Sequence, residues 1–399
     1  MMSTEILCCI ALFYQSLDFR SPAHNYVGQA LRIAMAHGMH TRMPVGNLGL
    51  NAVERCRKIW WTVYILDRNM SIIQGLPQSI DDRFVETNLP SLSESQEKNK
   101  ALDMHIKLCR SIDDINSTVY GLDGRINQKF LLSTKVALER IAKLADKLSE
   151  SFPLHLDDTD NGISRTSAYL HLLYQQCVII ATRPLLFCFL KIRLDSLERC
   201  RELLKKSQNI RNLIQMCLDS AQHSVGILHG LKSQGLLETF LNFDLESIFI
   251  STVVLLVVPV IDHLLLVDHI SWLEKAYAIF RDMVGATNKV AKFRWLELQQ
   301  LNETLNPIFQ DKASMAAQIN ISWQSDVGPQ LSSQTMRHIP TPSSRNSCNA
   351  PSTILGSSLE TNCGFEHILT SAEIMAMADS IEIDDSEWVS SAMMNQDVW

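Results

Sequence analysis

Residues 51–75 read NAVERCRKIWWTVYILDRNMSIIQG, and this stretch decides the fold class. Its apolar side chains recur every three or four residues, which is the spacing of one face of an α-helix. The pattern predicts a helix that begins at Asn51, with Glu54 three residues on as in a capping box, and that ends at Gly75 and Pro77. The side chains expected to be buried are Cys56, Ile59, Trp60, Val63 and Leu66 or Asp67.

Helical spacing also fills most of the chain up to about residue 305. A first pair of helices is predicted over 4–17 and 22–38, with Ser21 as N-cap, Pro22 at the first helical position and Gly38 at the end. No stretch shows the sustained alternation of a strand, so the fold class is all-α. Further helices are predicted over residues 99–119, 126–150, 165–183, 195–231, 244–267, 271–287 and 291–305.

The composition changes near residue 324 and divides the chain. From about Gln324 to Gly364 it is rich in Ser, Thr, Asn and Pro, which is too polar to form a core. We therefore expect a helical domain over residues 1–310, a mostly disordered linker over 311–364 and a short acidic segment over 365–399. Within that segment, Thr370 and Glu373 form the pattern of a capping box, which predicts one more short helix.

The C-terminal segment combines acidic residues with an apolar face. Residues 346–399 contain nine acids and no Lys or Arg. Such a segment stays soluble and can fold against a partner, so we expect an activation or docking segment. A C-terminal helix that docks on its own domain is the alternative. The candidate interaction residues are Ile374, Met377, Ile381, Trp388 and Trp399, and Ala378 shares the face of the first three.

The charge balance argues against direct DNA binding. The formal net charge is −7, and outside the acidic tail the 36 bases face only 34 acids. Phosphate backbones attract strongly basic surfaces, which this balance does not provide. The chain alone is expected to bind DNA poorly.

The cysteines and the most apolar stretch have simple explanations. Ten cysteines include no Cys-x-x-Cys pair, so they are interpreted as buried thiols in a reducing compartment, and no metal site or cofactor is expected.

Residues 248–261 are shorter than the roughly 20 residues of a membrane span and contain Pro259. They are expected to form a buried core helix, with no membrane involved. Glu5 in the first apolar run argues against a signal peptide.

An enzyme is the alternative function, and no catalytic residue is assigned to it. The chain has no phosphate loop and no nucleophile elbow. Asp113 and Asp114 begin a magnesium motif of the terpene-cyclase type, but Gly121 stands where its last acid should be. Paired aspartates at a helix start are more often caps. Likewise, Asp157–Gly162 lacks the final acid of a calcium loop and is interpreted as a turn.

Two motifs follow one another in residues 26–90. The first motif comprises Gly28, Ala30, Arg32, Ala34, Gly38 and His40, and the second comprises Trp60, Trp61, Tyr64, Asp67, Arg68, Gly75, Pro77, Asp81, Leu89 and Pro90. Together they resemble the middle-homology regulatory domain of fungal zinc-cluster transcription factors. Leu76 replaces the arginine of that family's Gly-Arg-Pro step. We expect the matching residues to hold the fold: small residues let helices approach, the tryptophans fill the core, and Asp67 and Arg68 form caps or ion pairs.

The resemblance implies a nuclear regulator of RNA polymerase II genes in a pathway, such as a metabolic one, that the sequence does not identify. It also implies partners in the transcription machinery or among co-regulators, a homo- or heterodimer partner, and a small-molecule inducer of unknown kind. The family binds DNA and zinc through an N-terminal six-cysteine module that these residues do not contain. A gene model that lost upstream exons is the favoured explanation, and a regulator that relies on a DNA-binding partner is the other.

Overall fold

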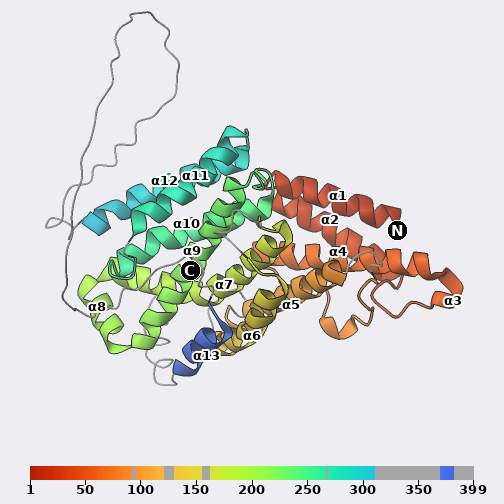
Figure 1. The fold of residues 1–399 in the computed structure, drawn as a ribbon, viewed down its shortest axis with the longest axis horizontal. Helices are drawn as coiled ribbons and strands as arrows, with labels where there is room; N and C mark the ends of the chain where they lie inside the picture. Colours follow the sequence, from red (N-terminus) through yellow and green to blue (C-terminus); the bar gives the residue numbers. More distant parts are fainter. Residues whose placement is uncertain (92–95, 121–129, 155–161, 267, 311–368, 382–399) are drawn as a thin grey trace, which may run out of the picture. The chain divides into compact units, whose positions relative to one another are not determined.

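The computed structural model describes residues 1–91, 96–120, 130–154, 162–266, 268–310 and 369–381. These residues form α-helices, one short 3-10 helix and no strand, as Figure 1 shows, so the all-α prediction is confirmed. The predicted linker over 311–364 lies outside the described residues, as do Trp388 and Trp399. The helices in chain order are α1 (Met2–Ser16), α2 (Arg20–Ala36), α3 (Val45–Leu48), α4 (Leu50–Gln74), η1 (Asp82–Phe84), α5 (Gln96–Thr118), α6 (Phe130–Ser151), α7 (Arg165–Asp195), α8 (Leu197–Lys206), α9 (Gln208–Ser233), α10 (Asn242–Ile261), α11 (His269–Gly285), α12 (Lys289–Gln310) and α13 (Ser371–Ser380).

Helix α4 confirms the predicted buried face but not the predicted cap. Every residue of the expected face is buried, and Trp60 is 0% exposed. The helix begins at Leu50 after Gly49, whose φ of +78° turns the chain without any side-chain cap. Glu54 instead pairs with Arg57, and Gly75 ends the helix in the left-handed conformation, as predicted.

Helices α1 and α2 pack against each other, and α2 packs on α4. Helix α2 begins at Arg20 with Phe19 as its N-cap, so the prediction of Ser21 was wrong and Pro22 is the third helical residue. Ala30 and Ala34 are buried, as expected of close packing. Gly28 does not serve that purpose, because a Cβ there would meet only the Arg32 guanidinium, at 3.7 Å.

Helix α7 passes the point where a break was predicted. Pro184 lies inside it, and a proline leaves the carbonyl four residues earlier without its helical donor. That carbonyl belongs to Ile180, and it accepts a hydrogen bond of 2.9 Å from the Tyr120 hydroxyl. The helix therefore continues to Asp195. The single helix predicted over 195–231 is divided, because Ser207 caps a new helix by accepting from the Ile210 amide.

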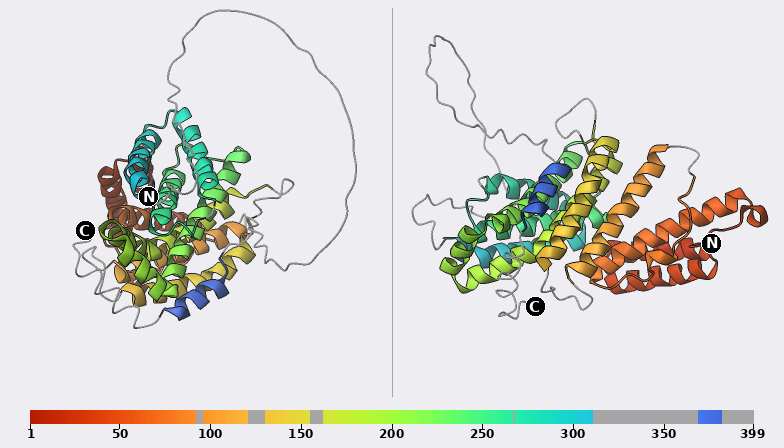
Figure 2. Two further views of the ribbon diagram at one scale, coloured as in Figure 1. Left: turned by 90° about the vertical axis from the view of Figure 1, so that its left-hand side faces the viewer. Right: turned by 90° about the horizontal axis from the view of Figure 1, so that it is seen from below.

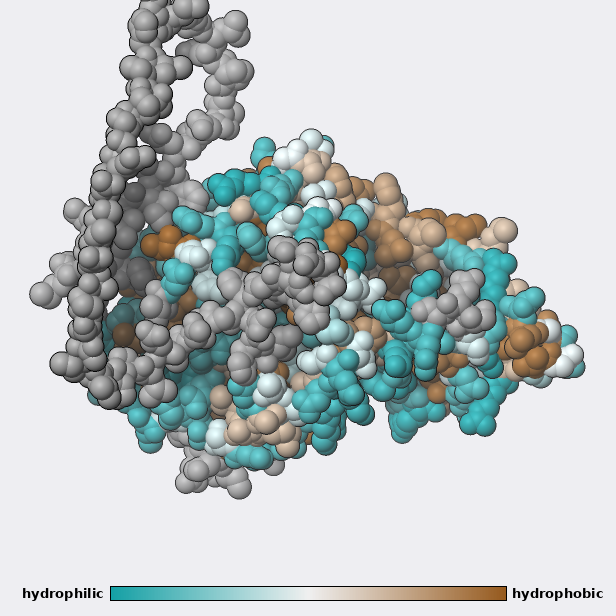
Figure 3. All heavy atoms as spheres, viewed as in Figure 1, coloured by the Kyte–Doolittle hydropathy of each residue, from teal (hydrophilic) through white to brown (hydrophobic). Residues whose placement is uncertain are grey.

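Helices α7, α9 and α10 pack together at the centre of the helical body (Figure 2). Helix α10 is long and apolar enough to cross a membrane, but 78% of its most apolar window is buried within the protein, as a core helix requires. Cys8, Cys56, Cys109, Cys177, Cys188, Cys200 and Cys217 are buried, whereas Cys9 is exposed and departs from the prediction. On the face drawn in Figure 3, apolar residues also reach the surface near α1, where Ile6 and Phe13 are exposed.

Helix α13 packs on α6 and touches α9. The predicted capping box is present, with Thr370 accepting from the Glu373 amide and Glu373 accepting in return. Ile374 and Ala378 are fully buried, and Met377 is partly buried. The apolar face of the acidic segment is thus covered by the chain's own helices, which is the arrangement that the alternative interpretation described.

Replacement of Trp60 by Ala should lower the free energy of unfolding by roughly 3–5 kcal/mol, because a large cavity would remain in the core. Arg57 is a poor control, since its side chain is only 16% exposed and pairs with Glu54. Lys58 is exposed and serves better. In urea unfolding, Lys58→Ala should have the wild-type free energy of unfolding within error. A larger loss of stability in Lys58→Ala than in Trp60→Ala would show that the assigned buried face of α4 is wrong.

Candidate functional site: a return segment fastened to helix α4

The second sequence motif forms one physical unit. Gly75 ends α4 with a φ of +63°, and the chain then runs back along the helix that it has just left. We call residues 76–91 the return segment. Its successive residues contact α4 in reverse order. Ser79 contacts Asp67, Asp82 contacts Tyr64, Asn88 contacts Trp61 and Ser91 contacts Glu54.

Polar side chains of α4 fasten the return segment at each end. Asp67, which is 1% exposed, accepts hydrogen bonds from both the hydroxyl and the amide of Ser79, at 2.6 and 3.2 Å. The indole of Trp61 donates to the carbonyl of Asn88 at 3.1 Å. Glu54 accepts from the Ser91 amide at 2.6 Å. Three side chains of α4 therefore bind the backbone of the return segment directly.

The first motif holds the same segment from the other side. The carbonyl of His40 accepts hydrogen bonds from the amides of Glu86 and Thr87, at 2.8 and 3.0 Å. Gly38, with a φ of +68°, ends α2 and directs the chain toward this contact. The two motifs, which lie about 20 to 50 residues apart in sequence, thus meet on the return segment.

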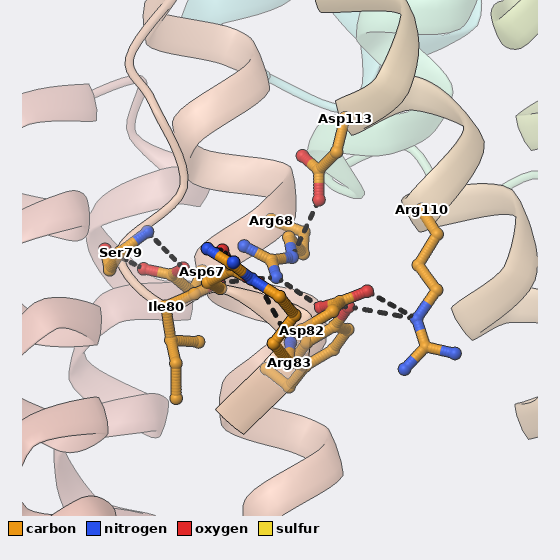
Figure 4. Close-up of polar contacts among 10 residues, drawn as sticks. Asp67, Arg68, Ser79, Ile80, Asp82, Arg83, Arg110 and Asp113 are labelled. Atoms are coloured by element: carbon orange, nitrogen blue, oxygen red, sulfur yellow. Dashed lines mark hydrogen bonds and ion pairs between the residues drawn. The ribbon is translucent and has the colours of Figure 1, made fainter. Parts of the chain in front are cut away.

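At the centre lies a buried arginine, Arg68, which is 0% exposed (Figure 4). Its Nη2 atom lies 2.7 Å from Asp82 and donates to the Ile80 carbonyl at 2.8 Å. Its Nε atom lies 2.7 Å from Asp113 of α5. The guanidinium also stacks on the ring of Tyr64, 4.5 Å from the centroid. One side chain therefore joins α4, the return segment and α5.

Two further contacts complete what we call the Arg68 cluster: Tyr64, Arg68, Asp82, Arg110 and Asp113. Tyr64 donates to Asp82 at 2.6 Å, and Arg110 of α5 lies 2.8 Å from the other oxygen of Asp82. The cluster thus places two arginines against two aspartates. A further acid, Asp67, directly precedes Arg68 in the chain.

The electrostatics of the cluster are set by burial. Burial raises the pKa of Asp113 to about 7, against the attraction of Arg68 and with added repulsion from Asp82, Asp67 and Asp114. Burial also raises the pKa of Tyr64 to about 12, so its hydroxyl remains a donor at neutral pH. The cluster is thus a set of ion pairs and hydrogen bonds in which Asp113 is held least firmly in its ionised form.

These carboxylates are engaged with cations. Asp113 pairs with Arg68, and Asp114 pairs with Arg140 at 2.6 Å, so the two residues that begin a magnesium motif point to separate arginines. Within the described residues, no group of three His, Cys, Asp or Glu side chains is placed to hold a metal ion. The run Asp157–Gly162, apart from Gly162 itself, lies outside the described residues. The geometry of the cluster is that of a structural fastener.

The remaining predicted site residues lie around this unit. Pro90 is buried and Leu89 partly so, whereas Arg32 and Pro77 are exposed. Asp81 caps η1 and pairs with the exposed Arg83, so its neighbour Asp82 has the central role that the sequence did not assign. Arg110 was also missed, because its partners Tyr64 and Asp82 lie on α4 and on the return segment, and no local pattern marks it.

Comparison with known proteins adds the family. Residues 3–164 match the fungal specific transcription factor domain, a match that spans α1 to α6 and includes the return segment. This part of the chain is therefore similar to the domain of that family. The resemblance noted in residues 26–90 is therefore confirmed, and the motif residues lie on α2 and the turn after it, on α4 and along the return segment.

Relatives of the chain carry names of the same kind. An uncharacterized transcriptional regulatory protein of Schizosaccharomyces pombe is 27% identical over 62% of this chain and 31% of its own length. The thiamine repressible genes regulatory protein of the same yeast is 22% identical over the same shares. An acetamidase regulatory protein of Aspergillus oryzae is 32% identical over 42% of this chain and 22% of its own length. The chain spans about a third of the length of the first of these relatives. No solved structure matches it.

Replacement of Arg68 by Ala should destabilise the domain by roughly 3–5 kcal/mol, because Asp82 and Asp113 would lose their shared cation inside the protein. Arg83→Ala is the matched control, since Arg83 is 83% exposed and pairs only with its neighbour Asp81. Limited proteolysis should cut the return segment faster in Arg68→Ala, and unfolding in urea should give the free energies. Equal stability of the two variants would refute the central role of Arg68.

The raised pKa of Asp113 gives a pH dependence with a defined sign. Its ordinary value is 3.8 and its folded value is about 7, so the folded state retains a proton that the unfolded state has lost between these values. The stability that this group contributes is present below pH 4 and is lost as the pH rises to 7, by on the order of 1 kcal/mol per pH unit.

Asp113→Asn should therefore flatten the fall in unfolding free energy between pH 5 and 7. Asp114→Asn is the control, because that carboxylate is half exposed and pairs with Arg140 instead. Urea titrations at several pH values would measure both slopes. An unchanged slope in Asp113→Asn would show that this carboxyl is ionised throughout the range.

Proposed function

We propose that this chain is the regulatory portion of a fungal transcription regulator that controls RNA polymerase II genes in the nucleus. The observation that carries the proposal is the fungal specific transcription factor domain at residues 3–164. The names of the relatives, which include transcriptional regulatory and acetamidase regulatory proteins, support it. The structure supports a scaffold role for the motif residues, because the Arg68 cluster is internally paired.

DNA contact is assigned to a part other than this chain. The bases and acids of residues 1–345 nearly balance, which gives little attraction for phosphate. In this proposal a zinc-cluster module, or a dimer partner that carries one, brings the regulatory domain to DNA. The chain itself has no proposed cofactor and no catalytic residue.

The acidic C-terminal segment is proposed to act as an activation segment that is docked on the body when inactive. Ile374, Ala378 and Ile381 are buried against the body. Asn209 of α9 donates to the carbonyl of Ser380 at 2.5 Å, which fixes the end of the helix. Near the other end, burial and the charge of Glu373 raise the pKa of Asp219 to about 6, an unfavourable pairing that limits how tightly the helix is held.

A docked helix and an activating helix would use the same apolar face, so a co-activator would have to compete with α6. The acids of α13 lie on its exposed side, since Glu373 and Asp379 are both exposed. The activation segment would thus be silent while α13 is docked and active when a partner or a change in the body releases it.

The experiment fuses the full chain to a foreign DNA-binding module with a reporter gene. Asn209→Asp should raise reporter output severalfold, because the donor to Ser380 is replaced by a negative charge facing a carbonyl oxygen, while α13 itself is unchanged. Asn212→Asp on the same helix is the control, since Asn212 accepts a hydrogen bond from Gln208 within α9.

The isolated segment 365–399, fused to the same module, should activate the reporter without the body. Ile374→Asp or Trp388→Ala should weaken it by removing apolar contact with the partner. A reporter that stays silent with the full-length fusion, with its Asn209→Asp variant and with the isolated segment would refute the proposed function. An active full-length fusion whose isolated segment is silent, together with lower stability of a chain truncated at Gly364, would show that α13 is only a structural helix.

A further inference from the structure

The helical body contains a hollow that the motifs do not explain. Its volume is about 930 Å³, and its walls come from α1, α2, α4, α5, α7, α10 and α12. On α4 it is lined by Ile65, Leu66 and Asn69, whereas the return segment is fastened through other residues of that helix. Ligand sites in proteins range from about 300 to 1,000 Å³, so the inter-helix hollow is large enough for a small organic molecule.

Most of its wall is apolar. Isoleucine and leucine side chains from α4, α5 and α7 form one side, with Ile112 and Leu173 each 1% exposed. Phe243 and Phe249 of α10 form another side, and the ring of Phe243 lies 4.5 Å from that of Tyr169. Such a wall favours an occupant with an aliphatic or aromatic body.

An uncharged polar pair lies in the same wall. The hydroxyl of Tyr169 on α7 is 3.0 Å from Nε2 of His105 on α5. Burial lowers the pKa of His105 to about 4, and burial raises the pKa of Tyr169 well above its usual value. Both groups are neutral at physiological pH, so they can exchange hydrogen bonds with an occupant without adding charge.

Among the charged residues that line the hollow, arginines outnumber carboxylates. Arg20, Arg183 and Arg294 face a single carboxylate, Glu246. Arg20 and Arg294 share that carboxylate, at 2.8 and 3.4 Å, and both also contact Asp18. These two arginines are therefore already neutralised.

Arg183 is in a different position. Its Nε atom donates to the Tyr120 hydroxyl at 3.1 Å, and its guanidinium lies over the ring of the same tyrosine. Among the ion pairs of the described residues, none joins Arg183 to a carboxylate. A guanidinium beside an apolar wall presents parallel N–H donors that match a carboxylate.

We propose that the inter-helix hollow binds a small amphipathic carboxylic acid. The carboxylate pairs with Arg183, and the apolar body lies against Phe243, Phe249 and the isoleucines. The His105–Tyr169 pair can accept a hydrogen bond from a polar substituent or donate one to it. The acid would act as an effector in the proposed regulatory function. Binding itself is measured on the purified chain, so it succeeds or fails independently of that function.

The test uses isothermal titration calorimetry of the purified full chain with decanoate, decan-1-ol and decylamine, which share one apolar body. Decanoate should bind most tightly, by on the order of tenfold over the alcohol, because only it can pair with Arg183. Arg183→Gln should remove that advantage and leave the alcohol unaffected. Arg199→Gln is the charge-matched control, since Arg199 is exposed on α8 away from the hollow.

A second variant, Ile72→Trp, fills the hollow from α4 and should abolish binding of all three probes. Circular dichroism and thermal unfolding would establish that each variant is folded. The proposal is overturned if wild type binds none of the probes, if decylamine binds as tightly as decanoate, or if a folded Arg183→Gln or Ile72→Trp variant binds decanoate as wild type does. A chain that binds no decanoate yet drives the reporter would leave the proposed function intact.

Discussion

The fold of the N-terminal domain depends on the placement of one charge, that of Arg68. A guanidinium with no exposed surface has lost its hydration, and this loss is large unless several partners replace the water. Here the partners are Asp82, Asp113, the Ile80 carbonyl and the face of Tyr64. They come from the return segment, α5 and α4, so these three parts must be in position together for the charge to be satisfied. A shift of any one of them would leave a buried cation or a buried acid without its counter-charge.

Much of the helical framework could be predicted from local sequence. The 3.6-residue spacing located the buried face of α4, Gly75 marked the end of that helix, and Thr370 marked the cap of α13. These features depend on neighbouring residues only. The errors arose where distant residues decide. Pro184 does not break α7, since Tyr120 satisfies the carbonyl that the proline exposes, and that contact spans 60 residues of sequence. The start of α4 is the exception, because Gly49, only two residues before the predicted Asn51, supplies the turn.

The candidate sites show the same division. The motif residues could be named from the sequence by resemblance, but the pairing of Asp113 with Arg68 could not, because α4 and α5 meet only in the folded chain. Two adjacent acids in isolation could as well have been a cap or the start of a metal motif. The inter-helix hollow left no local signal at all, since its wall takes a few residues from each of seven helices. In the sequence, Arg183 stands out only as the residue before Pro184.

The acid and base contacts around Glu246 also bear on how the chain reaches this structure. Arg20 and Glu246 are separated by 226 positions, and Arg294 and Asp18 by 276. Contacts between such distant positions form late, because the chain must close a long loop before they can contribute. During synthesis α1 and α2 leave the ribosome long before α10 and α12 exist. The first two helices must therefore wait for α10 and α12 before Arg20 can pair with Glu246 and Asp18 with Arg294. The packing of α1 and α2 on each other and on α4 therefore has to hold these helices before the ion pairs to α10 and α12 can add to their stability.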